Sequence, residues 1–128
     1  MPALKTARAD ARVTTTPNAT MTTLASPTQG GSGALSMWRV DMAAGQSGPE
    51  HVFDVEQAWH LLDGAAAVVV DGRAIELSAG DTVVVPAGSP RQVSTTAGAA
   101  FVVAGPAGGL ATPLGGGTPE PVAPAWIQ

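Results

Sequence analysis

The chain has 128 residues, 45% of them hydrophobic, which suits one domain with a single core. It contains no cysteine, which excludes disulfides, thiolate metal sites and a cysteine nucleophile. With 6 Lys or Arg against 10 Asp or Glu and a net charge of −4, it has no basic stripe to neutralise phosphates, so we expect no nucleic-acid partner.

Short strands with alternating apolar and polar residues are predicted along residues 19–105. The clearest is 34–42, where Trp38 and Val40 fall on one side and Arg39 and Asp41 on the other, so the Trp38 side should face the core. Further strands are expected at 19–26, 50–53, 56–62, 65–70, 73–78, 81–86, 91–95 and 99–105.

Glycine and proline separate these strands. Asp71-Gly72 between 65–70 and 73–78 predicts a two-residue hairpin, because glycine tolerates the positive φ of such turns. No segment has a helical period, and short strands between Gly and Pro turns are typical of an all-β sandwich or barrel.

The predicted organisation is an N-terminal arm (1–18), a β-barrel domain (19–105) and a C-terminal tail (106–128). The arm could add an edge strand. The tail is rich in glycine and proline and cannot bury enough apolar surface to fold alone. Trp126 and Ile127 could anchor its end on the barrel or on a partner subunit.

Two spaced motifs resemble those of the cupin family, whose members are small jelly-roll barrels. The first cupin motif is Gly, five residues, His-x-His, three or four residues, Glu, six residues, Gly. The second is Gly, five residues, Pro-x-Gly, two residues, His, three residues, Asn. The first is matched here by Gly45, His51, Phe53, Gln57 and Gly64, and the second by Gly80, Pro86, Gly88, Arg91 and Thr95.

The resemblance implies a cupin-type jelly-roll barrel (a double-stranded β-helix) but does not carry over the usual metal site. Metal-binding cupins use the positions held here by His51, Phe53, Gln57 and Arg91. One imidazole and one amide oxygen are too few donors for a divalent ion, and a guanidinium repels it. We therefore expect no cofactor. The alternative is a divalent metal such as Zn, Fe or Ni held by His51, Gln57 and water.

Strand alternation together with the resemblance predicts a mostly apolar cavity inside the barrel. Its expected walls are Trp38, Val40, Phe53, Trp59 and Leu61.

His51, Arg91 and Gln57 are the candidate catalytic residues. Arg91 and Gln57 would hold a ligand oxygen, and His51 would move a proton. The resemblance offers precedents in metal-free sugar epimerases and aromatic polyketide cyclases. We therefore predict a metal-independent isomerase, lyase or cyclase that acts on a carbonyl-containing metabolite.

Four alternatives remain open. The chain could be a non-catalytic small-ligand-binding cupin, or a metal-dependent, dioxygenase-like cupin. His51 could also be a core histidine bonded to Gln57. Arg91 could pair with Glu50, Asp54 or Glu56 at the barrel mouth.

The expected partners are a small-molecule substrate or ligand and a second copy of the chain. Cupins commonly pair through sheet edges and outer faces, so we expect a homodimer. The longest purely apolar run, 65–70, is far too short to cross a bilayer, and no apolar stretch follows the charged N-terminus. We expect a cytoplasmic protein without a membrane partner.

Overall fold

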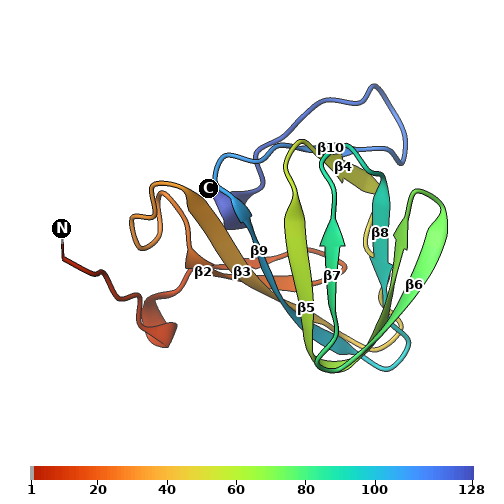
Figure 1. Cartoon of the computed structure of the whole chain (residues 1–128), viewed down its shortest axis with the longest axis horizontal. Coiled ribbons are helices and arrows are strands. Elements are labelled where there is room, and N and C mark those ends of the chain that lie inside the picture. The colour runs from red at the N-terminus through yellow and green to blue at the C-terminus, as the bar shows by residue number, and fades with distance from the viewer. Residues whose placement is uncertain (1) are drawn as a thin grey trace.

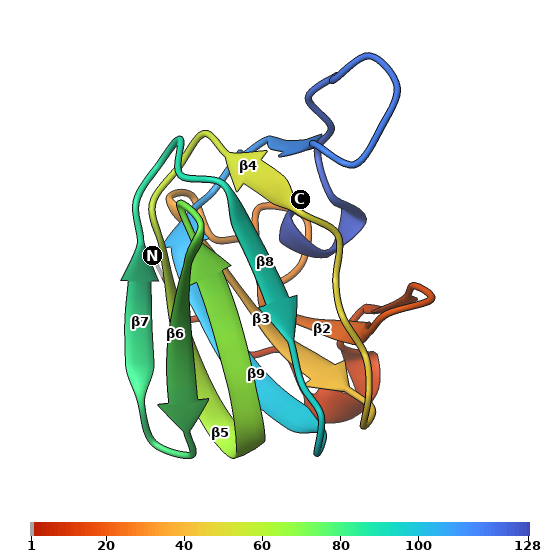
Figure 2. The same ribbon diagram turned by 90° about the vertical axis from the view of Figure 1, so that its right-hand side faces the viewer.

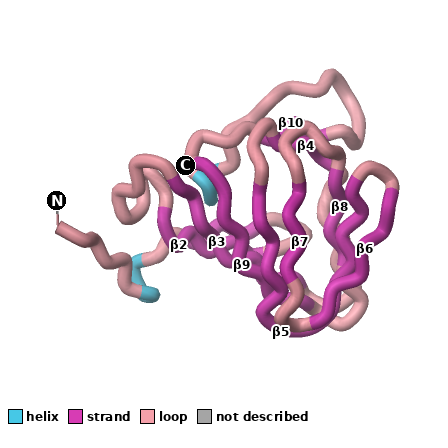
Figure 3. Tube along the Cα trace, viewed as in Figure 1, coloured by secondary structure: helices cyan, strands magenta, loops and turns pink. Residues whose placement is uncertain are grey.

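The computed structural model describes residues 2–128 and is built almost entirely of strands (Figure 3). The strands are β1 (Val13–Thr15), β2 (Thr20–Ala25), β3 (Leu35–Met42), β4 (His51–Phe53), β5 (Gln57–Val70), β6 (Arg73–Ser78), β7 (Thr82–Val85), β8 (Arg91–Ser94), β9 (Ala99–Pro106) and β10 (Ala111–Pro113). Two 3-10 helices, η1 (Arg8–Asp10) and η2 (Ala125–Ile127), lie outside them. Within residues 2–128, no helix combines the length and apolar character needed to span a membrane. The predicted all-β class is confirmed.

The strands form two curved layers that share β5 (Figures 1 and 2). The first half of β5 pairs with β7 and β9, and β9 leads through β3 and β2 to β1. Its second half pairs with β6 and β8, and β8 leads through β4 to β10. All these pairings are antiparallel, which fits the predicted jelly-roll barrel.

Strand β5 runs unbroken for 14 residues, where two strands at 56–62 and 65–70 were predicted. A bulge between Leu61 and Asp63 shifts its register against β9. Gly64 follows with φ +82°, a conformation that strongly favours glycine. The glycine thus bends the strand from one layer into the other, and it does not end the strand.

The hairpin predicted at Asp71-Gly72 is confirmed. Asp71 has φ 51° and Gly72 has φ 78°, so both central residues adopt the positive φ of a type I′ turn. The turn fixes the register that pairs Val70 with Arg73 and Val68 with Ile75.

The core lies between the two layers and follows the predicted alternation. On β3, Trp38, Val40 and Met42 are buried, whereas Met37 and Arg39 face outward. Phe101 on β9 and Leu61 on β5 are fully buried. These residues fix which face of each sheet points toward the interior.

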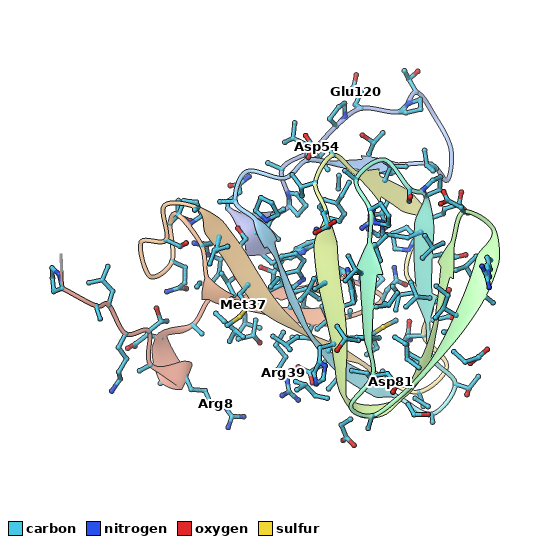
Figure 4. All side chains as sticks on the ribbon, in the orientation of Figure 1. Arg8, Met37, Arg39, Asp54, Asp81 and Glu120 are labelled. Atoms are coloured by element: carbon cyan, nitrogen blue, oxygen red, sulfur yellow. The ribbon has the colours of Figure 1, made fainter. Side chains whose placement is uncertain are left out.

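A short strand near each end of the chain pairs with the barrel, whereas the first described residues of the chain extend away from it (Figure 1). In the predicted arm, β1 pairs with β2, and in the predicted tail, β10 pairs with β4. The loop between β10 and η2 extends away from the barrel in Figure 2 and carries Glu120, labelled in Figure 4.

Side chains of the barrel and the arm fix the end of the tail. The Thr23 hydroxyl donates to Trp126 O at 2.8 Å, the Ser36 hydroxyl to Ile127 O at 2.6 Å, and Arg12 Nη1 to Ala125 O at 2.7 Å. Ile127 is buried.

Candidate functional site

A cavity of about 360 Å³ opens between the two layers, next to the C-terminal tail. It is lined by Thr16, Asn18, Ala19, Met21, Trp38, Val40, Met42, Gly48, Pro49, His51, Phe53, Trp59, Val93, Ala111, Pro113, Val122, Pro124 and Trp126. Ten of these residues lie on β2, β3, β4, β5, β8 and β10, and segments 16–19, 48–49 and 122–126 supply the rest of the wall.

The lining is apolar and carries no charged side chain. All three tryptophans of the sequence contribute to it, and the only other polar side chains are those of Thr16, Asn18 and His51. One buried donor, Trp38 Nε1, has no hydrogen-bond partner within residues 2–128. A cavity of this size and character suits a small organic molecule.

His51 is the titratable residue of the cavity lining. It stands at the start of β4, and its Nδ1 lies 2.9 Å from the carbonyl oxygen of Pro49. Because a carbonyl can only accept, Nδ1 must carry the hydrogen, and Nε2 of the neutral ring is then an unprotonated acceptor. Burial lowers the pKa of His51; the bond to Pro49 opposes this shift and the charge of Arg91 adds to it. The ring is therefore a neutral base at pH 7.

Arg91 is fully buried at the start of β8, and its guanidinium donates to oxygen atoms of the protein itself. Nε and Nη2 donate to Ser89 O at 3.2 and 3.1 Å, Nη2 also to Pro86 O at 3.1 Å, and Nη1 to Gln57 Oε1 at 3.3 Å. Burial lowers the pKa of Arg91 to about 10, which leaves it charged at neutral pH. The cation thus ties the β7–β8 loop to β5.

The predicted site residues divide into two groups. His51, Phe53, Trp59, Trp38 and Val40 line the cavity, as expected of pocket residues. Arg91, Gln57 and Leu61 do not line it.

Phe53 connects the two groups. Its ring meets the His51 ring edge to face at 5.2 Å, and the Arg91 guanidinium carbon lies 5.5 Å from its centroid. Such a contact between a cation and a ring stabilises the charge. The guanidinium therefore lies against a cavity wall without reaching the cavity itself.

The two structural alternatives for His51 and Arg91 do not form. His51 bonds to Pro49 O and not to Gln57, whose oxygen accepts from Arg91 and from Trp59 Nε1 at 3.2 Å. Within residues 2–128, Arg91 makes no ion pair with Glu50, Asp54 or Glu56, since its guanidinium points into the protein and not toward the barrel mouth.

The residues at the four cupin ligand positions do not fit a metal ion. Gln57 Oε1, the second possible ligand, accepts two hydrogen bonds, one of them from a cation. Phe53 and Arg91 occupy the other two positions. No group of three or more His, Cys, Asp or Glu side chains in residues 2–128 could hold a metal. The donor chemistry of this set is that of a hydrogen-bond network, not of a coordination sphere.

Several lining residues were not predicted as site residues. Met42 lies on the core face of 34–42, so the alternation that selected Trp38 and Val40 could have found it. Trp126 was predicted to anchor the tail, and its side chain also lines the cavity. The tail has no alternation of apolar and polar residues, so its sequence does not indicate which part of the cavity wall it forms.

The sequence matches one protein family model, described as Cupin domain, over residues 38–104. No curated protein matches the chain.

Solved structures share the fold at low identity. A polyketide cyclase, RemF from Streptomyces resistomycificus, has a TM-score of 0.68 and 22% identity over 80% of this chain and 78% of its own. An RmlC-like cupin from Shewanella frigidimarina has a TM-score of 0.69 and 18% identity over 80% and 88% of the two chains. A salicylate 1,2-dioxygenase from Pseudoaminobacter salicylatoxidans has a TM-score of 0.66 and 23% identity over 73% of this chain. This chain spans only 26% of the dioxygenase.

Proposed function

This chain belongs to the cupin family, and from that premise we propose that it is a metal-independent enzyme that transfers a proton on a carbonyl-containing small molecule. The observation that carries the proposal is His51, a neutral base and the titratable side chain of a mostly apolar cavity lining. Abstraction of a proton beside a carbonyl needs such a base and no metal. Isomerisation, elimination and cyclisation all begin with this step.

The developing negative charge on the carbonyl oxygen needs a hydrogen-bond donor. Arg91 and Gln57 were the predicted donors, but both are bonded to the protein and neither lines the cavity. We assign the donor role to the Trp38 indole, whose ring lines the cavity and whose N–H has no partner in the described chain; because this nitrogen is buried, the ring must turn for the N–H to meet a ligand oxygen. Arg91 and Gln57 then act as positioning residues that hold β5, β8 and the loop before β8.

Two structural neighbours carry names from different reaction classes. The polyketide cyclase aligns over 80% of this chain and the dioxygenase over 73%, both under 25% identity, so they share the fold without choosing between the reactions. We favour a cyclase-type reaction over a dioxygenase-type one because Phe53, Gln57 and Arg91 do not fit a metal ion.

A non-catalytic ligand-binding module is the second candidate. The observation that favours it is that the Arg91 charge is committed to backbone carbonyls, so the cavity lacks the cation that would best stabilise an enolate. Under this alternative, His51 would orient a ligand without exchanging protons.

Proton exchange in D2O separates the two candidates. We expect the protein to accelerate deuterium incorporation beside the carbonyl of 2-tetralone, measured by NMR. His51→Gln should lower the rate by roughly 10²–10⁴-fold, the usual contribution of a general base. His60→Gln is the matched control, because His60 Nδ1 bonds Thr82 Oγ1 at 2.7 Å, away from the cavity lining.

Two results would decide against this proposal. Equal rates in wild type and His51→Gln would favour the binding module. Loss of exchange on treatment with EDTA, with recovery on adding zinc, would establish a metal-dependent reaction instead.

A further inference from the structure

The side chains that line the cavity indicate the chemical class of the ligand that it binds. We propose that it selects an uncharged, flat, mainly aromatic molecule that brings one hydroxyl donor, of phenol or enol type, to Nε2 of His51. This inference rests on the proposed function only in taking the same cavity as the site. It concerns selectivity in binding and does not require turnover.

The absence of charge from the lining excludes ionised ligands. No lining residue is Asp, Glu, Lys or Arg, so a carboxylate or ammonium group would lose its water without gaining a counter-ion. The buried Arg91 does not compensate, because its hydrogen bonds go to Pro86, Ser89 and Gln57. A sugar is also a poor match, since its many hydroxyls would meet an almost wholly apolar wall.

The shape of the wall favours a planar ring system. Trp38, Trp59 and Trp126 line the cavity together with Phe53, so flat surfaces surround the space. Aromatic faces and edges of this kind stabilise an aromatic guest beyond the burial of its area. The volume, about 360 Å³, equals that of about twelve liquid waters at about 30 Å³ each, which leaves room for two or three fused rings.

The tautomer of His51 decides the polar group. Nδ1 donates to Pro49 O, which leaves Nε2 as an acceptor without a hydrogen-bond partner in the described part of the chain. Besides the indoles, Asn18 and Thr16 are the other polar residues of the lining, and the Thr16 hydroxyl already donates to Ala19 O at 3.2 Å. A ligand hydroxyl satisfies Nε2, whereas an ether or a carbonyl in the same place leaves it unpaired. The hydroxyl therefore confers selectivity.

Three matched probes test the class: 2-naphthol, its methyl ether 2-methoxynaphthalene, and 2-naphthoate. Binding is followed by quenching of tryptophan fluorescence and by calorimetry at pH 7.5. We expect 2-naphthol to bind about fivefold more tightly than the ether, the value of one net hydrogen bond, and at least tenfold more tightly than the anion. In His51→Phe the advantage over the ether should disappear, and in His60→Gln it should persist.

A measurement on the wild type keeps the test independent of the variant's folding. Addition of 2-naphthol should shift the ¹⁵N resonance of His51 Nε2, and addition of the ether should shift it less. The inference is overturned if 2-naphthoate binds best, if none of the three probes binds, if the preference for naphthol survives His51→Phe, or if both neutral probes shift Nε2 equally. Selectivity without deuterium exchange would overturn only the proposed function. Exchange without selectivity would overturn only this inference.

Discussion

Replacing Gly64 with alanine is expected to destabilise the barrel far more than the same change at Gly45. The two glycines have nearly equal backbone angles, φ +82° and +79°. Left-handed strain therefore costs about 1–2 kcal/mol at either position. The two sites differ in space: an added Cβ at Gly64 would lie 2.0 Å from Gly98 O, whereas at Gly45 it would meet nothing within 4 Å.

The extra cost at Gly64 follows from the movement that the new carbon demands. Non-bonded carbon–oxygen contacts lie near 3.3 Å, so β5 and β9 would have to separate locally by about 1.3 Å. This movement breaks the hydrogen bond from Ala65 N–H to Gly98 O and disturbs the pairing of Gly64 with Ala99. With roughly 1 kcal/mol for each lost hydrogen bond, plus the cost of repacking, we expect a total loss of about 4 kcal/mol.

Urea unfolding followed by tryptophan fluorescence measures both variants against wild type. We expect Gly45→Ala to lower the free energy of unfolding by about 1–2 kcal/mol, and Gly64→Ala by at least twice that, with an unchanged dependence on urea. Losses within about 0.5 kcal/mol of each other, the error of such comparisons, would refute the steric argument.

Four further predictions concern the cavity and its surroundings. Burial lowers the pKa of His51 below its usual 6.5, so the unfolded chain binds more protons, and the free energy of unfolding should fall as the pH drops through 6.5. Urea unfolding at pH 7.5 and 5.5 should show a smaller pH dependence of this free energy in His51→Phe than in wild type, and equal dependence would count against the prediction. Arg91→Lys should lower the free energy of unfolding in urea by about 2 kcal/mol, because one ammonium cannot donate to the oxygens of Pro86, Ser89 and Gln57 together. An unchanged free energy of unfolding would show that these bonds contribute little to stability. Trp126→Ala should weaken 2-naphthol binding roughly tenfold in the fluorescence assay, and unchanged affinity would remove the tail from the site. Met37 is 39% exposed on the outer face of β3, in a groove with Arg8 and Arg39 (Figure 4). We expect light scattering to show a dimer that Met37→Lys converts to a monomer, and a monomeric wild type would contradict this prediction.

Much of the barrel was predictable because its local signals agree with one another. Alternation placed Trp38 and Val40 inside, and Asp71-Gly72 specified its own turn. These features depend on residues close together in the sequence, so a period of two or a single glycine is enough to reveal them.

The site was less predictable because its bonds go to backbone carbonyls, whose directions follow from loop conformation and not from residue type. The guanidinium of Arg91 is held by the carbonyls of Pro86 and Ser89, and the direction of these carbonyls is set by a loop conformation that no residue pattern encodes. In the same way, the tautomer of His51 follows from one carbonyl at Pro49. The sequence could identify the residue types at these positions but not which of them face the cavity.

The cavity wall brings together parts of the chain that are far apart, and this has a consequence for how the protein forms. The hydrogen bond that seats the tail joins Thr23 to Trp126, 103 residues away along the chain. Contacts of such long range slow folding, because the ends of a long loop must meet before the contact can repay the entropy lost. The cavity should thus be the last part of the structure to form. A fluorescent ligand added during refolding would report completion of the native state and not the earlier collapse of the chain.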